Sequence, residues 1–262
     1  MKRSLLRVSA IVALMASPAA FASEPDLDHT AWDTLLHRYV DEQGRVDYRA
    51  WHEEGRHALE AYLQRPAETD VSRLANEEAL AFWINAYNAC VVKGVLDRYP
   101  LRSVKEVSGF FERITCRIAG ESLTLNAMEV RGRQLGDWRL HFALVCASSS
   151  CPSLRREAYI PGRLNEQLDE QTRQFLADPQ RGLRVEGRTL RLSKIFDWYK
   201  TDFIPAGELG WLGRLTPEKL LLRIEPYLSR RTAEAIRSRQ LALAFLDYNW
   251  SLNERTGDRG EK

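Results

Sequence analysis

Apolar residues recur at helical spacing along much of the chain, and one segment is far more apolar than the rest. In residues 77–99 they run most of the way round the helix before Pro100 ends it, which predicts a central buried helix. The same spacing predicts helices over 28–39, 57–64 (ending before Pro66) and 164–177. It also predicts a helix that starts near Asn126, a helical turn from Ser193, and a helix capped by Thr216 with Pro217 in its first turn.

Alternating apolar and polar residues predict short strands between these helices. ITCRIAGESLTL has two alternating runs around residues 119–121, and LRVEGRTLRL has two around Gly187, so each predicts a hairpin. Residues 242–247 predict a further short strand or helix. We therefore expect a single α+β domain, in which the central helix packs on short antiparallel strands and hairpins.

The segment HFALVCASSSCPSL, residues 141–154, indicates where a site would lie. Residues 142–145 form an unbroken apolar run, which predicts a short buried strand. A loop of small residues then joins Cys146 to Cys151, and Pro152 fixes the backbone where another element could begin. Loops that follow buried strands often carry functional groups, so we expect the site in this loop.

The first residues have the pattern of an export signal. Lys2 and Arg3 precede an apolar stretch over residues 5–15, and residues 20–22 have the small-x-small pattern of a cleavage site. That stretch is too short to cross a bilayer, and we expect no transmembrane segment in the mature chain. We predict a signal peptide at 1–22, a globular domain at 23–253, a polar tail at 254–262, and a periplasmic or secreted protein.

The charge of the chain argues against nucleic acid as a partner. Lysine and arginine total 38 against 36 aspartate and glutamate residues, which gives a formal net charge of +2. The basic residues are scattered apart from short clusters such as Arg155–Arg156, so no basic stripe is present. We expect a small-molecule, peptide or envelope ligand instead.

Four cysteines, Cys90, Cys116, Cys146 and Cys151, allow three complete disulfide pairings in an exported protein. We favour the interpretation that Cys90 and Cys116 are unpaired core residues, the first in the apolar helix and the second in a strand. The short separation of Cys146 and Cys151 permits a loop-closing disulfide. The sequence gives no preference between that disulfide and two free thiols.

Four segments together resemble a known family: FWINAYNA at 82–89, the segment 141–154, FDWYKTDF at 196–203 and YNWSLN at 248–253. They are similar to the family known as domain of unknown function 547, over roughly residues 81–253. The resemblance implies no established reaction. Members of this family tend to carry a histidine after the glutamate of the LNAMEV segment, where this chain has Val130.

Several polar residues are candidates for ligand binding. Asn85 and Asn88 share one face of the central helix, where they either contact a ligand or, as we favour, tie the helix to neighbouring backbone. Glu129 follows Asn126 by three residues, which is the spacing of a helix N-cap and its reciprocal partner. We favour this capping role for Glu129 over a role as general acid or base or in substrate binding.

A histidine and two thiols suggest nucleophilic catalysis. His141 is the candidate base, and Cys146 or Cys151 is the candidate nucleophile. On a regular strand His141 and Cys146 face opposite sides, so they would meet only if the strand ended or bulged. Cys151 precedes Pro152 at a possible helix start, where backbone N–H groups would favour its thiolate.

The serines and one aspartate complete the candidate site. Ser148, Ser149 and Ser150 either bind an anion or form a turn that bonds its own backbone. Asp202 is expected to accept a hydrogen bond from a histidine or from helix-end amides. The sequence contains no G-x-S-x-G or glycine-rich phosphate motif, which disfavours an ordinary serine hydrolase, and no H-E-x-x-H motif, so we expect no metal. We expect no cofactor either.

Two functional hypotheses follow. The first is an exported enzyme that hydrolyses or transfers an amide-like bond, with a Cys146 or Cys151 nucleophile, His141 as base and Asp202 as support. Asn85 and Asn88 would orient the substrate. The alternative is a non-catalytic periplasmic binding or envelope-assembly module, whose Cys146–Cys151 loop is closed by a disulfide.

Overall fold

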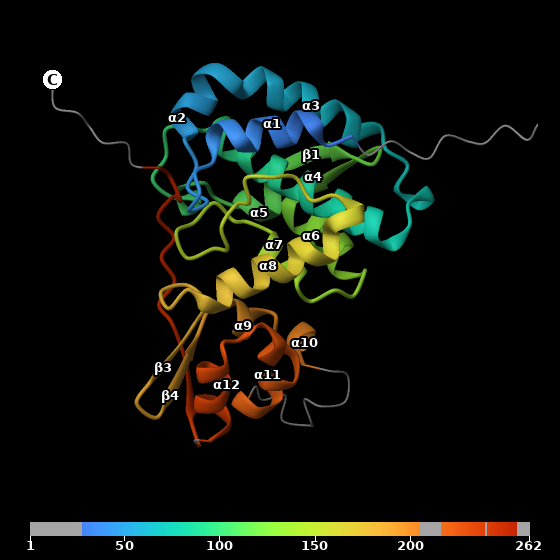
Figure 1. Ribbon diagram of the computed structural model, residues 1–262. Helices are drawn as coiled ribbons and strands as arrows, with labels where there is room; N and C mark the ends of the chain where they lie inside the picture. Colours follow the sequence, from blue (N-terminus) through green and yellow to red (C-terminus); the bar gives the residue numbers. More distant parts are fainter. Residues whose placement is uncertain (1–27, 205–215, 239, 256–262) are drawn as a thin grey trace, which may run out of the picture.

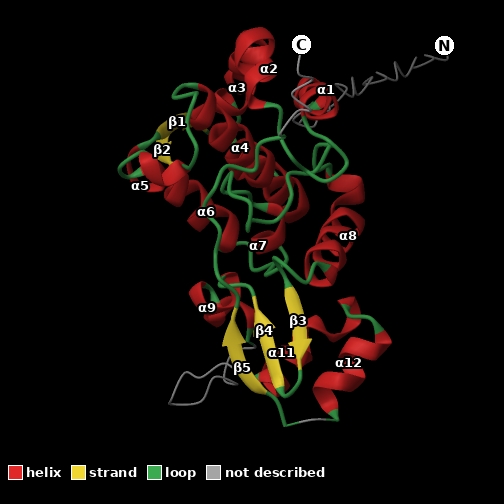
Figure 2. Cartoon of the chain, turned by 90° about the vertical axis from the view of Figure 1, so that its left-hand side faces the viewer, coloured by secondary structure: helices red, strands yellow, loops and turns green. Residues whose placement is uncertain are grey.

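The computed structural model describes residues 28–204, 216–238 and 240–255, and the expected signal peptide lies outside them. Helices dominate the upper part of the molecule and a small sheet lies below them (Figures 1 and 2). The upper part contains α1 (Thr30–Tyr39), α2 (Tyr48–Ala50), α3 (Arg56–Glu68), α4 (Asn76–Leu96), α5 (Phe110–Arg113), β1 (Thr115–Ile118), β2 (Glu121–Thr124), α6 (Leu125–Arg133), α7 (Leu140–Ala143) and α8 (Leu164–Ala177). The lower part contains β3 (Leu183–Glu186), β4 (Thr189–Leu192), α9 (Ile195–Trp198), α10 (Lys200–Phe203), α11 (Pro217–Ile224), α12 (Arg230–Arg237) and β5 (Ala242–Phe245).

Helix α4 is the predicted central helix. Every residue from Ala79 to Val92 is buried, because α3, α6 and the β1–β2 hairpin pack around it. It is long and apolar enough to cross a membrane, yet 94% of its most apolar window is buried inside the protein. The predicted α+β fold is therefore confirmed, with a core helix at its centre.

The two hairpins form as predicted, and the second belongs to a mixed sheet. β1 pairs with β2, and the turn between them places Ala119 and Gly120 at φ +52° and +77°. β3 pairs antiparallel with β4, and β5 adds to β4 in parallel. This parallel pair differs from the expected all-antiparallel arrangement, because the chain passes through α11 and α12 before it returns to the sheet.

The C-terminal segment connects the sheet to the upper helices (Figure 1, red). It forms isolated bridges to Ser148, Ser103 and Val46 as it ascends from β5. Glu254 accepts a hydrogen bond from the Tyr99 hydroxyl, and the Arg255 amide donates to the Val46 carbonyl, so residues 254 and 255 also pack on the upper part of the molecule. This segment carries Tyr248 and Trp250 to the centre of the molecule.

The strand predicted over residues 142–145 is wrong. Leu140–Ala143 form the helical turn α7, and residues 144 and 145 continue without joining a sheet. Phe142 belongs to the lower hydrophobic cluster, whereas Leu140 and Ala143 belong to the upper one. The run is apolar on all sides because it lies between two cores, a pattern that a short helix shares with a buried strand.

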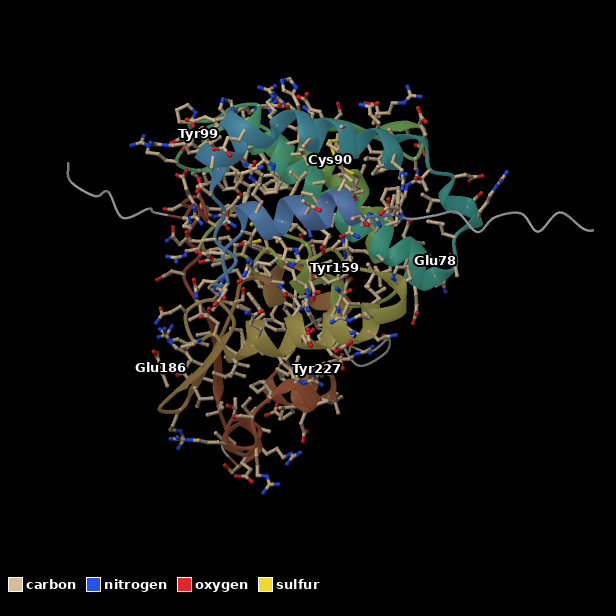
Figure 3. The ribbon with its side chains drawn as sticks, turned by 45° about the horizontal axis from the view of Figure 1, so that its top comes forward. Glu78, Cys90, Tyr99, Tyr159, Glu186 and Tyr227 are labelled. Carbon is tan, nitrogen blue, oxygen red and sulfur yellow. A yellow bond between two sulfur atoms is a disulfide. The ribbon has the colours of Figure 1, made fainter. Side chains whose placement is uncertain are left out.

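The prediction that Cys90 and Cys116 are unpaired is also wrong. They form a disulfide between α4 and β1, with Cα atoms 6.3 Å apart (Figure 3 labels Cys90), whereas Cys146 and Cys151 are free thiols. The separation lies in the ordinary range for a disulfide. Helix α3 also continues through Pro66, and the carbonyls of Pro66 and Ala67 accept hydrogen bonds from the β1–β2 turn.

Candidate functional site

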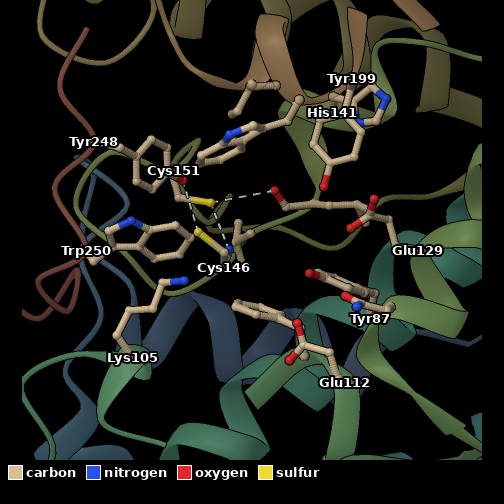
Figure 4. Close-up of a pocket in the computed structure, with 16 residues that line it drawn as sticks. Tyr87, Lys105, Glu112, Glu129, His141, Cys146, Cys151, Tyr199, Tyr248 and Trp250 are labelled. Atoms are coloured by element: carbon tan, nitrogen blue, oxygen red, sulfur yellow. Dashed lines mark hydrogen bonds between the residues drawn. The ribbon is translucent and has the colours of Figure 1, made fainter. Parts of the chain in front are cut away.

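A cavity of about 390 Å³ lies between the upper helices and the lower part of the chain (Figure 4). The loop after α7 forms one wall with Cys146 and Cys151, and α7 contributes His141. The remaining lining comes from α4, the 104–112 region, α6, α9 with Tyr199, and the C-terminal segment. The cavity is therefore built from segments far apart in the sequence.

Cys146 presents a half-buried sulfur to this cavity. The Tyr248 and Ser148 hydroxyls lie 3.2 and 3.1 Å from its Sγ atom, and the two hydroxyl oxygens lie 3.3 Å apart. A thiolate only accepts hydrogen bonds, so these hydroxyls favour the deprotonated form. Burial raises the pKa of Cys146, but hydrogen bonds from Cys151, Ser148 and Tyr248 outweigh it and lower the pKa to about 7.

Cys151 lies directly beside Cys146 and has the opposite character. Its Sγ atom accepts the Cys146 backbone N–H at 2.8 Å, and the residue is 4% exposed. Burial and the neighbouring Cys146 raise the pKa of Cys151 well above its usual value. The expected thiolate at a helix start is therefore wrong, because no helix begins at Pro152.

His141 and Asp202 form a hydrogen-bonded pair at the side of the cavity. Nε2 of His141 lies 2.9 Å from Asp202 Oδ2, and Arg133 donates to both carboxylate oxygens at 2.7 and 3.0 Å. The hydrogen bond from His141, followed by the Arg133 guanidinium, holds the pKa of Asp202 well below its usual range. An ionised carboxylate accepts, so Nε2 carries the proton and Nδ1 of the neutral ring is the basic nitrogen.

His141 and Cys146 line the same cavity, although they share no hydrogen bond. The extended backbone after α7 removes the strict alternation of a strand, which would have placed the two side chains on opposite faces. The Tyr199 ring stacks on His141 with centroids 4.1 Å apart. The histidine is thus held by Asp202 on one nitrogen and by Tyr199 on its face.

Tyr87 and Glu129 face the cysteines across the cavity. Tyr87 is 4% exposed, and its hydroxyl points into the cavity without a hydrogen bond to any residue described (Figure 4). Burial, then Glu129 and Cys146, raise the pKa of Tyr87, so its hydroxyl remains protonated. The cap predicted for Glu129 is wrong, because Thr124 caps α6 by accepting the Ala127 amide.

Aromatic rings and charges surround the mouth of the cavity. Trp198 is 45% exposed, and its ring stacks on that of Trp250 with centroids 5.9 Å apart. Lys105 places Nζ 4.1 Å from the centroid of Trp250. Lys105, Glu112 and Glu129 make no ion pair within the described part of the chain, so their charges face the cavity.

Asn85 and Asn88 lie outside the cavity lining, and their side chains hydrogen-bond the backbone of neighbouring segments instead. Asn85 exchanges hydrogen bonds of 2.7 and 3.0 Å with the backbone of Tyr159. Asn88 donates to the Ala143 carbonyl and accepts the Val145 amide, both at 3.0 Å. The favoured interpretation, a buried network that ties α4 to its neighbours, matches these contacts. Asn88 thereby positions the backbone that precedes Cys146.

The three serines have different environments. Ser148 contacts Cys146 and Tyr248, as described above. Ser149 donates to the Ser251 carbonyl at 3.0 Å, and Ser150 accepts the Asn249 amide at 2.8 Å. Ser149 and Ser150 therefore fasten the C-terminal segment to the loop, rather than bonding their own turn.

Comparison with known families adds one finding. Residues 71–176 match a family model described as protein of unknown function, DUF547. This part of the chain is therefore similar to the DUF547 family. No curated protein and no solved structure matches the chain. The DUF547 match includes α4, α6, α7 and the Cys146–Cys151 loop, whereas residues 196–203 and 248–253 lie beyond it.

The cavity thus combines residues inside the matched segment with residues outside it. Five lining residues that lie inside the match are Tyr87, Glu129, His141, Cys146 and Cys151. Four that lie after it are Trp198, Tyr199, Tyr248 and Trp250, and Asp202, which bonds His141, also lies after it. Across the described ranges, no group of three or more His, Cys, Asp or Glu side chains is arranged to hold a metal ion.

Sequence reasoning missed Tyr87, Arg133, Lys105, Glu112 and Tyr248. Tyr87 and Tyr248 occur within the recognised segments FWINAYNA and YNWSLN, so a signal was present, but their rings resemble ordinary core residues. Lys105, Glu112 and Arg133 resemble ordinary surface charges in the sequence and gave no signal.

Proposed function

We propose that this protein is an exported thiol-dependent hydrolase or transferase that acts at an amide-like bond. The observation that carries the proposal is the Cys146 sulfur, which faces the cavity while two hydroxyls hydrogen-bond it. With a pKa of about 7, much of Cys146 is thiolate at neutral pH. The structural disulfide between Cys90 and Cys116 supports export to an oxidising compartment.

In this proposal Cys146 attacks the carbonyl carbon of the substrate. The attack forms an S–C bond and moves the carbonyl electrons onto oxygen, which then requires a hydrogen-bond donor. The Tyr87 hydroxyl, which bonds none of the described residues, is the group we assign to that role, because it is protonated, buried and directed into the cavity. Collapse of this intermediate expels the leaving group and leaves an acylated Cys146.

His141 acts after this attack in our proposal. The thiol is already activated by hydroxyls, so it does not need the histidine to remove its proton. The Asp202 carboxylate holds His141 with Nδ1 as the basic atom, and the same contact stabilises the ring when it is protonated. His141 would protonate the leaving group and then activate the water or acceptor that releases the acyl group.

The cavity mouth favours a substrate with both a flat apolar surface and a cationic group. Trp198 and Trp250 offer ring faces on which a sugar or a planar peptide group can stack. Glu112 and Glu129 offer carboxylates without an ion-pair partner, and Lys105 offers one cation. A peptide or aminoacyl compound of the envelope has these features.

The test uses p-nitrophenyl acetate, since an activated ester reports attack at an acyl carbon. We expect a burst of p-nitrophenolate and one acetyl group on Cys146, both abolished by Cys146→Ser. His141→Ala should keep the burst and slow the turnover that follows by about 10²-fold or more. His57→Ala is the matched control, because His57 lies fully exposed on α3.

Three results would contradict this proposal. Acylation that survives Cys146→Ser, or that maps to another residue, removes Cys146 as the nucleophile. Equal turnover in wild type and His141→Ala removes the role of His141. A purified protein in which Cys146 is joined to Cys151, and which is still not acylated after dithiothreitol has reduced that bond, would favour the binding or assembly module.

A further inference from the structure

Two thiols lie side by side in the loop that borders the cavity. The Cys146 amide donates to Cys151 Sγ at 2.8 Å, both side chains line the cavity, and both are unpaired. We propose that Cys146 and Cys151 form a redox-active dithiol that exchanges with small cationic disulfides, in which Cys146 attacks and Cys151 resolves. This reaction goes beyond the proposed acyl chemistry and does not depend on it.

The two sulfurs are unequal in the way that exchange requires. Cys146 is half-buried and hydrogen-bonded by two hydroxyls, so it is the accessible and more acidic thiol. Cys151 is 4% exposed, and burial raises its pKa, so it stays protonated while Cys146 reacts. An exposed thiolate that attacks and a buried thiol that resolves are the usual division of labour in thiol–disulfide exchange.

The loop between them lets the sulfurs meet. Ala147 adopts a left-handed backbone with φ +58°, and the Cys151 amide donates to the Ser148 carbonyl at 3.1 Å. These features turn the chain back, so that Cys151 lies next to Cys146 (Figure 4). The existing Cys90–Cys116 disulfide is 0% and 8% exposed at its two residues, so it provides an internal reference that should not exchange.

The reaction balances with a small disulfide as oxidant. The Cys146 thiolate attacks one sulfur, an S–S bond to Cys146 forms, and one thiolate leaves. Cys151 then attacks Cys146 Sγ, its proton passes to the second departing thiolate, and the Cys146–Cys151 disulfide forms. The protein loses two electrons, and the small disulfide is reduced to two thiols. Oxidation would remove the Cys146 thiolate and so suppress the acyl chemistry reversibly.

Cystamine is the probe, because it is a small disulfide with cationic ends that suits the carboxylates of the cavity. We expect wild-type protein to form a Cys146–Cys151 disulfide, mapped by peptide mass spectrometry after acid quenching, with only a transient cysteamine adduct on Cys146. Cys151→Ser should accumulate that adduct at Cys146, and Cys146→Ser should form neither product. Dithiothreitol should reverse the change while Cys90–Cys116 persists.

A cysteamine adduct that persists on wild-type Cys146 would overturn the proposal, since Cys151 then fails to resolve it. The same holds if cystamine leaves Cys146 unmodified while iodoacetamide alkylates it, a result that leaves the acyl proposal intact. If neither reagent modifies Cys146, both proposals fail. Should Cys151→Ser not fold, the order of adduct and disulfide in quenched wild-type samples gives the same answer.

Discussion

At the scale of single residues, the surroundings of Cys146 decide its chemistry. Burial alone would raise the pKa of a cysteine, and that effect dominates at Cys151. At Cys146 the hydroxyls of Tyr248 and Ser148 and the neighbouring thiol outweigh burial. Two cysteines only five positions apart therefore differ in acidity, because hydrogen bonds outweigh burial at Cys146, whereas burial and the neighbouring Cys146 outweigh the hydrogen bonds at Cys151.

This difference predicts the pH dependence of labelling. The thiolate is the reactive form, so alkylation of Cys146 by iodoacetamide should rise with pH and reach half its maximum near pH 7. Tyr248→Phe removes one donor, so the midpoint should move to higher pH, and the thiolate fraction at pH 6 falls about tenfold for a midpoint one pH unit higher. Tyr227→Phe, far from the cavity, is the control. A wild-type midpoint near that of a free cysteine would contradict the prediction.

At the scale of elements, α4 positions its neighbours through two amides. Asn85 and Asn88 each satisfy one backbone N–H and one carbonyl on an adjacent segment. The segment held by Asn85 is the loop at Tyr159, and the segment held by Asn88 is the backbone between α7 and Cys146. Buried amides with this pairing are common, and they make the helix a template for loops that lack regular structure.

The two asparagines form a matched pair for experiment. Asn85→Ala and Asn88→Ala should each lower the free energy of unfolding by about 1–3 kcal/mol, because each leaves two buried backbone groups without partners. Only Asn88→Ala should also change the alkylation rate of Cys146, since only Asn88 holds the preceding backbone. Urea unfolding and iodoacetamide kinetics measure the two effects. Equal alkylation rates in both variants would contradict the positioning role.

At the scale of the whole molecule, the cavity exists because two hydrophobic clusters meet around α7. The upper cluster supplies Tyr87 and the cysteine loop, while α9, α10 and the C-terminal segment supply the aromatic wall and Asp202. The Cys90–Cys116 disulfide strengthens the upper cluster by joining α4 to β1. Among the charged residues that line the cavity, the carboxylates of Glu112 and Glu129 outnumber the single cation of Lys105.

The disulfide should contribute measurably to stability. It joins residues 26 positions apart, and loop-closure entropy for such a span corresponds to about 3–4 kcal/mol. Replacing both Cys90 and Cys116 with alanine should therefore lower the free energy of urea unfolding by roughly that amount. In urea, where unfolding exposes the buried disulfide, reductant should lower the unfolding midpoint of the wild type and leave that of the double variant unchanged. A wild type that is insensitive to reductant would contradict the prediction.

The charges of the cavity predict selective labelling. A cationic methanethiosulfonate should modify Cys146 about five- to tenfold faster than an anionic one, after correction for their rates with a free thiol, because Glu112 and Glu129 line the same cavity. Glu129→Gln should reduce this ratio, and added salt should reduce it further. Glu60→Gln, on the outer surface of α3, is the control. A ratio near one would contradict the prediction.

Local patterns predicted most of the fold. Helices over 28–39, 77–99 and 164–177 and both hairpins occur where their periodicity placed them, because amphipathic spacing and turn residues act over a few positions. The apolar run at 142–145 failed because burial on all sides makes a helical turn and a strand look alike. The loop that the sequence singled out by its cysteines borders the cavity, and Asp202 accepts a hydrogen bond from a histidine.

The sequence by itself determined the α+β class, the central helix and the loop that carries Cys146 and Cys151, since these depend on residues that are neighbours along the chain. Tertiary structure alone decided which cysteines are paired, which thiol is acidic and which side chains surround it. Those properties depend on distances between segments as far apart as Cys146 and Tyr248, and on burial that arises only when two clusters pack together. Periodicity carries no information about such contacts.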